Sequence, residues 1–202
     1  MKKIILLLIL SLIVVGLGIS EVTAVSDAET QANDILNKNN TDSKILVVYF
    51  SRTGENYNVG NVEVGNTAMV ASYIKDYLKA DSFEIIPVNK YPDKYQECLD
   101  QATKEKNENA RPEIQNKITN FDQYDTIFVG YPIWWGDLPM IMHTFFESYD
   151  FNGKKVIPFN THEGSGDAGT YSTVQKDLPK ANVTTDGLAL DGKTARSDDG
   201  KQ

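Results

Sequence analysis

Continuous apolar stretches alternate along this chain with segments whose apolar residues recur at helical spacing. Residues 44–50 (KILVVYF) are apolar without interruption after Lys44, which is typical of a strand buried on both faces. In residues 67–79 apolar side chains recur three or four positions apart, which predicts an amphipathic helix. The same patterns predict further strands at residues 82–88, 126–130, 155–159 and 187–190, and further helices at residues 139–148 and 171–178. Residues 95–109 are polar and helix-prone, and they are predicted to form another helix.

This alternation of strands and helices predicts an α/β fold, in which right-handed crossovers connect the strands of a parallel sheet. Ligands of such open sheets bind beyond the carboxyl ends of the strands. The segments that follow residues 50, 130 and 159 are therefore the candidate site, and they are also the most unusual in composition.

The first segment combines hydroxyls, glycines and a helix start. Ser51, Arg52 and Thr53 follow the first strand, and Asn66 and Thr67 precede the first helix. Backbone N–H groups at a helix start are unpaired and favour an anion, so a phosphate monoester fits here. This first segment contains neither a GxxxxGK[ST] nor a GxGxxG pattern. The alternative is that Asn66 or Thr67 only caps the helix.

The second segment, residues 131–139, holds both tryptophans of the chain side by side. Two adjacent side chains at a strand end cannot both enter one core, so at least one indole is expected to face the cleft or solvent, where it can stack on a planar ring. The alternative is that one indole packs under the next helix and the other covers a partner protein. The candidate residues here are Pro132, Ile133, Trp134, Trp135 and Gly136.

The third segment, residues 160–169, is rich in glycine, which allows close approach of the backbone to a ligand. Its hydroxyls and its histidine can hydrogen-bond to a heterocyclic ring. For His162 three roles stay open: part of a cofactor wall, a general acid, or neither. The candidate residues here are Thr161, His162, Glu163, Gly164, Ser165 and Gly166.

Together, the motifs YFSRTG (49–54), GYPIWWGDLP (130–139), TFFE (144–147) and THEGSG (161–166) resemble the flavodoxin-like family of FMN proteins. The resemblance implies a doubly wound, five-stranded parallel sheet in the order 2-1-3-4-5 within three αβα layers, with FMN between strands 1 and 3. It also implies that Ser51, Arg52, Thr53, Asn66 and Thr67 hold the phosphate. Residues 132–136 would flank the isoalloxazine, with Trp134 or Trp135 stacked on it, and residues 161–166 would close the other side.

Two features depart from the family pattern. Residues 55–65 are inserted between the two halves of the phosphate loop, so either Asn56 or Asn66 could serve it; the register with Asn66 is favoured because Thr67 directly precedes the helix. Residues 191–202 contain Ala195 as their only apolar residue. They cannot supply an apolar stripe, so we expect the terminal helix to be shortened or absent.

Composition narrows the function classes. The formal charge of −8 argues against nucleic-acid binding. One cysteine excludes an intramolecular disulfide and a CxxC site, and two histidines are few for a metal centre. Beside a bound flavin, the acidity predicts a low midpoint potential, because negative surroundings disfavour the anionic reduced ring.

The amino terminus has the pattern of a targeting segment. Lys2 and Lys3 precede an apolar run at residues 4–19, and Val22 and Ala24 have the spacing of a cleavage site. We interpret residues 1–24 as a signal peptide, with an uncleaved anchor as the alternative, and the polar residues 25–43 as a tether. Residues 44–202 then form the domain, outside the cytoplasmic membrane of a bacterium.

The sequence thus predicts an exported, FMN-binding electron-transfer protein. Its partners would be a redox protein or a small-molecule electron donor or acceptor, and membrane contact would be limited to an uncleaved amino-terminal segment. Two alternatives stay open: an FMN reductase linked to NAD(P)H or a quinone, and an α/β binding domain without cofactor. No catalytic side chain and no metal ligand is predicted, because FMN would carry the electrons.

Overall fold

The fold is built on one parallel sheet in the order β4-β1-β5-β6, with the last position shared by β7 and β8. In chain order this arrangement is 2-1-3-4-5, as predicted. The computed structural model describes residues 44–197, so the predicted signal peptide and tether lie outside the described residues. The strands are β1 (Lys44–Tyr49), β4 (Asp81–Glu84), β5 (Tyr124–Pro132), β6 (Lys155–His162), β7 (Asn182–Val183) and β8 (Leu188–Asp191).

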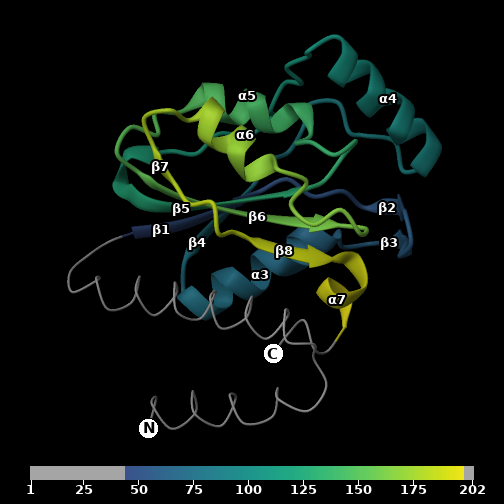
Figure 1. Ribbon diagram of the computed structural model, residues 1–202, viewed down its shortest axis with the longest axis horizontal. Helices are drawn as coiled ribbons and strands as arrows, with labels where there is room; N and C mark the ends of the chain where they lie inside the picture. The colour runs from purple at the N-terminus through teal and green to yellow at the C-terminus, as the bar shows by residue number, and fades with distance from the viewer. Residues whose placement is uncertain (1–43, 198–202) are drawn as a thin grey trace, which may run out of the picture. The chain divides into compact units, whose positions relative to one another are not determined.

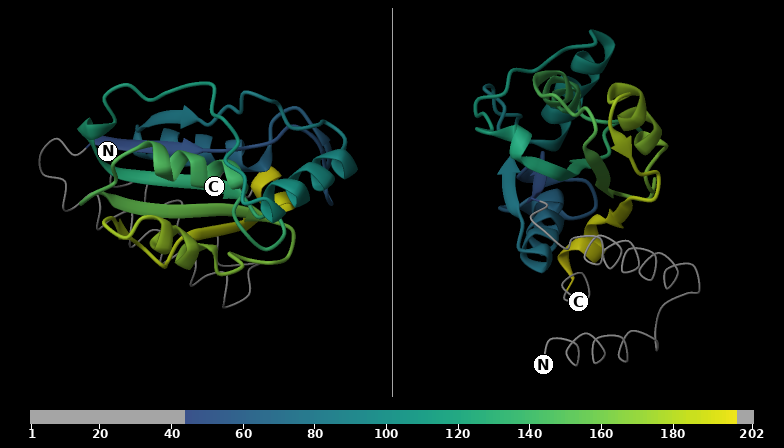
Figure 2. Two further views of the ribbon diagram at one scale, coloured as in Figure 1. Left: turned by 90° about the horizontal axis from the view of Figure 1, so that it is seen from above. Right: turned by 90° about the vertical axis from the view of Figure 1, so that its left-hand side faces the viewer.

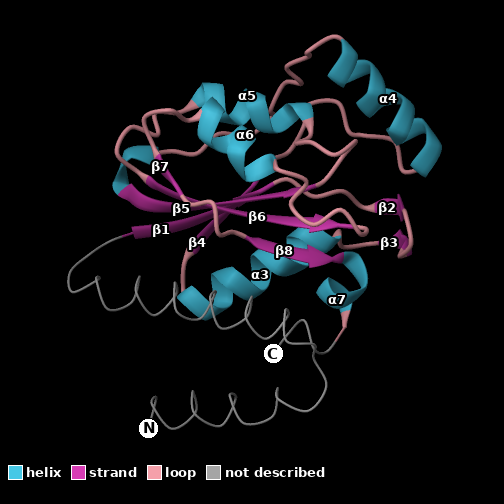
Figure 3. Ribbon diagram, in the orientation of Figure 1, coloured by secondary structure: helices cyan, strands magenta, loops and turns pink. Residues whose placement is uncertain are grey.

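Helices cover both faces of this sheet and give the three predicted layers (Figures 1 and 3). α4, α5 and α6 lie on one side, and α3 and α7 lie on the other. The view along the strands in Figure 2 shows the same division. The helices are α3 (Asn66–Leu78), α4 (Tyr95–Asn107), α5 (Met140–Ser148), α6 (Thr170–Asp177), α7 (Gly192–Arg196) and the 3-10 turn η2 (Phe121–Gln123).

Alternate side chains of β1 enter two separate cores, which explains why its sequence is apolar without interruption. Leu46 and Val48 belong to the larger core, together with β5 and the helix α5. Val47 belongs to the smaller core, together with α3, and Ala195 of α7 is completely buried there. The five-residue α7 is therefore a shortened terminal helix, as expected, and its Ala195 packs against both α3 and the sheet.

Several element boundaries differ from the predictions. β5 and β6 run further than expected, so Pro132, Thr161 and His162 lie on strands rather than in loops. β4 ends at Glu84. Ile85 still donates to the Tyr49 carbonyl of β1, and from Pro87 the chain pairs with the segment around Ile114. The fifth strand is divided into β7 and β8, which pair with opposite ends of β6.

The inserted residues 55–65 form most of a small antiparallel hairpin, which the apolar pattern did not predict. Its strands are β2 (Gly54–Asn56) and β3 (Gly60–Val62). Figure 1 shows this hairpin at the end of the sheet where the arrowheads of β6 and β8 point. The insert therefore lies beside the carboxyl ends of the strands. None of the helices within residues 44–197 is both long and apolar enough to cross a membrane.

Candidate functional site

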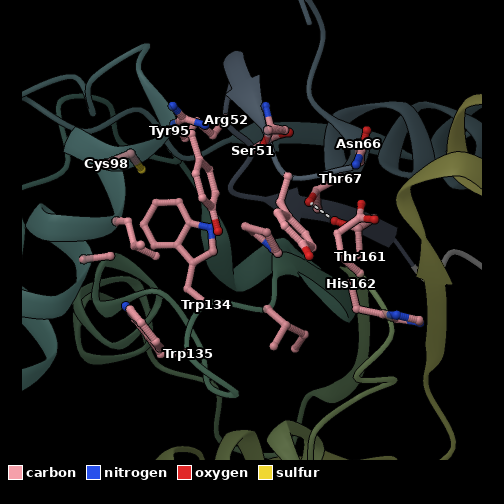
Figure 4. A pocket seen from close by; sticks show the side chains of 17 residues that line it. Ser51, Arg52, Asn66, Thr67, Tyr95, Cys98, Trp134, Trp135, Thr161 and His162 are labelled. Atoms are coloured by element: carbon pink, nitrogen blue, oxygen red, sulfur yellow. Dashed lines mark hydrogen bonds between the residues drawn. The ribbon is translucent and has the colours of Figure 1, made fainter. Parts of the chain in front are cut away.

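A pocket opens at the carboxyl ends of β1, β5 and β6 (Figure 4). All three segments singled out in the sequence contribute to it. Eleven of the predicted residues line this pocket: Ser51, Arg52, Asn66, Thr67, Pro132, Ile133, Trp134, Trp135, Thr161, His162 and Glu163. Thr53, Gly136, Gly164, Ser165 and Gly166 do not line it.

Backbone N–H groups without a hydrogen-bond acceptor gather at the amino-terminal end of α3. The Ser51 hydroxyl accepts a hydrogen bond from the Ala68 N–H at 3.0 Å and so fixes the loop to the helix. Within the described residues, the backbone N–H groups of Ser51, Arg52, Thr53, Asn66 and Thr67 donate no hydrogen bond. α3 also has no acidic side chain in its first turn, so its positive end is free to attract an anion. We call Ser51–Thr53 with Gly65–Thr67 the cradle.

Gly65 allows the two halves of the cradle to lie against each other. A Cβ at this position would overlap the Ser51 hydroxyl and the Arg52 carbonyl oxygen. Deeper in the pocket, the Thr67 and Thr161 hydroxyls are hydrogen-bonded at 2.8 Å, and both side chains are buried (Figure 4). This bond joins the cradle to β6.

The structure separates the two candidate registers of the phosphate loop. α3 begins at Asn66, which agrees with the favoured register. Asn56 lies in β2, and its amide donates to the Gly54 carbonyl within the hairpin at 3.0 Å. Both asparagines line the pocket, but only Asn66 stands at a helix start.

The Arg52 side chain points to the loop before α4 rather than serving the cradle. Its guanidinium donates to the carbonyls of Pro92 at 2.7 Å, Asp93 at 2.9 Å and Glu55. The residue is only 8% exposed. Arg52 therefore fastens the first loop to the α4 side of the pocket, and only its backbone N–H remains available to an anion.

The two tryptophans have different environments. Trp134 packs edge-on against Phe50 and Tyr91, with ring centroids 5.5 Å and 5.0 Å away. Trp135 is 55% exposed and has a φ of 53°. It is followed by Gly136 at 68°, in a tight turn closed by two hydrogen bonds between Trp134 and Asp137. One indole is thus held by core rings, and the other is presented at the pocket mouth.

The third segment is held in place by a buried residue that the sequence did not single out. Asn160 is fully buried; its amide donates to the Gly166 carbonyl at 3.1 Å and accepts from the Tyr171 hydroxyl at 2.8 Å. These bonds position the glycine-rich turn that follows β6. That turn supports the pocket wall without lining it.

His162 is held as a neutral ring. Its Nδ1 accepts from the Gly164 N–H at 3.0 Å, so the neutral ring carries its proton on Nε2. Burial lowers the pKa of His162, although Asp191 and Asp167 partly oppose this effect. The ring extends away from Trp134 and Tyr95 (Figure 4), so His162 belongs to the wall.

A pH titration should report this environment. The folded protein binds a proton at His162 less readily than the unfolded chain, whose pKa is about 6.5. The stability due to the neutral ring is therefore complete above that value and declines as the pH falls below it. We expect the His162 Cε1–H signal in NMR to titrate below pH ~6.5. A midpoint at or above that of free histidine would contradict this. The free energy of unfolding of His162→Gln should fall less between about pH 7 and pH 5 than that of the unmodified protein.

A further wall of the pocket is made by the hairpin and α4, which the sequence had not suggested. The Tyr57 and Tyr95 rings stack with centroids 6.0 Å apart, and they are 58% and 37% exposed. The additional lining residues are Asn56, Tyr57, Tyr95, Cys98, Leu99 and Ala102. The last four are spaced as one face of a helix, and this spacing is the signal that could have found them.

Cys98 is buried against this wall and should be chemically inert. Burial raises the pKa of its thiol to about 11, so the reactive thiolate is scarce at neutral pH. We expect a thiol-specific reagent at pH 8 to label the folded protein far more slowly than the urea-unfolded protein. Equal labelling rates would show that the thiol is open to solvent.

The pocket thus combines anion donors at one end with aromatic rings at the other. No cluster of His, Cys, Asp or Glu within residues 44–197 could hold a metal ion. Such a pocket suits an elongated ligand with a phosphate and a planar ring. Fold and pocket together define a doubly wound α/β protein that binds its ligand at the topological switch point.

Comparison with known proteins gives the family. Residues 44–201 match the flavodoxin family, and the chain belongs to that family. No curated protein sequence matches the chain.

The solved structures similar to this one include the following three. An inferred flavoprotein from Bacteroides eggerthii is 32% identical, with a TM-score of 0.61, over 76% of this chain and 94% of the other. One from Bacteroides uniformis is 31% identical, with a TM-score of 0.63, over 77% and 97%. A flavoprotein from Lactobacillus acidophilus in complex with FMN is 23% identical, with a TM-score of 0.59, over 75% and 95%. All three support the fold.

Proposed function

We propose that this chain binds FMN in the pocket and transfers electrons through it. The observation that carries the proposal is the cradle, whose unpaired N–H groups surround the start of α3. The flavoprotein from Lactobacillus acidophilus, which shares the fold, was solved with FMN. Bound FMN would supply the redox chemistry, and the protein would supply binding and electrostatics.

The residues present fit the two ends of FMN. The phosphate suits the cradle, whose two halves lie against each other because Gly65 has no Cβ. The isoalloxazine suits the aromatic end, where Trp134 is held by Phe50 and Tyr91. The Thr67 and Thr161 hydroxyls also belong to the lining and are suited to the ribityl chain.

An absorption spectrum with and without added FMN tests this proposal. Binding should quench flavin fluorescence and give a visible spectrum that survives gel filtration. Riboflavin, which lacks the phosphate, should bind more weakly if the cradle is the phosphate site. A protein that stays colourless after FMN titration would instead support the α/β binding domain without cofactor.

The acidic chain favours a low midpoint potential for the bound flavin. The formal charge is −8, and Glu163 lies in the pocket lining. Burial is the main reason that the pKa of this carboxyl is raised. Potentiometry should give a midpoint below that of free FMN, and added salt should reduce the difference by screening these charges. A midpoint above that of free FMN would contradict this part of the proposal.

A reductase is the second candidate, and the exposed aromatic rings at the pocket mouth favour it. Tyr57, Tyr95 and Trp135 are large, exposed and all part of the pocket lining. Such rings can stack on a planar acceptor such as a quinone or a nicotinamide. Stopped-flow mixing of the FMN-loaded protein with NADH or NADPH separates the candidates. Rapid bleaching of the flavin favours the reductase, and its absence favours the carrier.

Export is part of the proposal and rests on the sequence of residues 1–24. Expression of the full chain in a bacterium, followed by fractionation and amino-terminal sequencing, tests it. A mature protein that begins at Val25 outside the cytoplasm would support cleavage. A full-length protein in the membrane fraction would support the uncleaved anchor.

A further inference from the structure

The carboxyl-terminal segment reaches the cradle from the far end of the chain. The Arg196 guanidinium donates through Nη1 to the Val64 carbonyl and to the Asn66 Oδ1, each at 2.8 Å. These two acceptors flank Gly65, which is the N-cap of α3. Arg196 therefore holds the turn whose N–H groups point at the proposed phosphate.

α7 gives Arg196 a defined position. The Asp191 side chain caps the helix by accepting from the N–H groups of Lys193 and Thr194 at 3.0 Å and 3.1 Å. Ala195 is completely buried in the core formed with α3. Gly192 packs so closely that a Cβ there would overlap the side chains of Glu163 and Asn66. These contacts hold the short helix in place, and so they fix the backbone position from which the Arg196 side chain extends.

Arg196 also differs from Arg52 in how many of its guanidinium donors are occupied. The Arg52 guanidinium is occupied by three backbone carbonyls on the α4 side. The Arg196 guanidinium is only partly buried, and within the described residues its Nε and Nη2 make no hydrogen bond. The Glu163 carboxyl lies close to Asn66, since both surround Gly192. A dianionic phosphate entering this corner meets a carboxyl, and the Arg196 cation offsets that repulsion.

We propose that Arg196 is a positioning residue of the phosphate site, and that it makes the pocket prefer flavins that carry a terminal phosphate monoester. It does so by fixing the Val64–Gly65–Asn66 turn and by adding positive charge beside it. The inference rests on the proposed binding of FMN. It gives a function to a carboxyl-terminal segment for which the sequence predicted only a shortened or absent helix.

The experiment compares FMN with riboflavin, using fluorescence quenching on the full chain. In Arg196→Gln the affinity for FMN should fall about tenfold, the effect of roughly one charge-assisted contact, while riboflavin affinity changes by less than about twofold. The decline of FMN affinity with salt should also become shallower. Arg196→Lys, which keeps the charge, should retain most of the preference for FMN. Lys193→Gln is the matched control, because it removes one positive charge from the same helix at an exposed position.

Each outcome decides a separate point. Equal weakening of FMN and riboflavin in Arg196→Gln would show that α7 only stabilises the fold, and would overturn the inference. So would an unchanged FMN affinity, or an equal effect of Lys193→Gln. Should Arg196→Gln not fold, Arg196→Lys still decides: loss of the FMN preference with riboflavin affinity intact would contradict the role of charge. Failure of the unmodified protein to bind FMN would overturn the proposed function and this inference with it.

Discussion

Replacing Gly65 with alanine should nearly abolish FMN binding. The backbone of Gly65 has a φ of −70° and a ψ of 155°, which alanine adopts freely, so the effect is steric. The new methyl group would overlap the Arg52 carbonyl oxygen as well as the Ser51 hydroxyl. A backbone atom cannot rotate away, so the two halves of the cradle must separate. Losing two hydrogen bonds to a charged group weakens binding by about 3–6 kcal/mol, measurable by FMN titration.

A glycine elsewhere in the same loop provides the control. Gly60 lies in the hairpin with a φ of 79°, and a Cβ there would meet nothing within 4 Å. Gly60→Ala should lower the free energy of unfolding by about 1 kcal/mol because of the backbone conformation. It should leave the FMN affinity almost unchanged. Similar affinities for Gly65→Ala and the unmodified protein would mean that the phosphate binds elsewhere.

Replacing Arg52 with alanine should cause a large loss of stability. The side chain is buried and satisfies carbonyls of Pro92, Asp93 and Glu55. Its removal leaves these acceptors without their partner, which costs about 3–4 kcal/mol. Urea denaturation would measure the change. Arg52→Lys should not restore the loss, because an ammonium cannot reproduce the planar fork.

Arg111 is the matched control for that substitution. It forms an ion pair with Glu147 at 2.8 Å, but both side chains are substantially exposed. Arg111→Ala should therefore change the free energy of unfolding by less than about 1 kcal/mol. Equal losses of unfolding free energy in the two alanine variants would contradict the conclusion that the buried Arg52 side chain stabilises this loop.

The apolar pattern predicted the sheet well because each strand of a parallel sheet is buried on both faces. β1 shows this directly, since Leu46, Val47 and Val48 fill the two cores in turn. The hairpin of residues 54–62 was not predictable in this way, because Gly54, Glu55 and Asn56 carry no apolar alternation. Its form depends on tertiary contacts, such as the bond from the Glu55 N–H to the Asp93 carbonyl.

The site was predictable where its chemistry follows directly from a strand end. Ser51, Trp134 and Thr161 each come at or just beyond the end of a central strand, and the fold brings those ends together. Side-chain direction was not predictable. The Arg52 side chain donates hydrogen bonds to backbone carbonyls of residues about forty positions further along the chain. No local sequence pattern reveals such a partner. The contribution of α4 was hidden because that helix is mostly polar.

The contact between Arg196 and Asn66 joins residues 130 positions apart, which gives the pocket a place in the order of folding. Contacts of such long sequence separation form late, after local helices and neighbouring strands. A nascent chain can therefore pair its central strands before the cradle has its last fixed contact. Tight uptake of FMN would then mark a completed molecule, and a chain that stops before Arg196 would carry the strands of the sheet without a finished phosphate site.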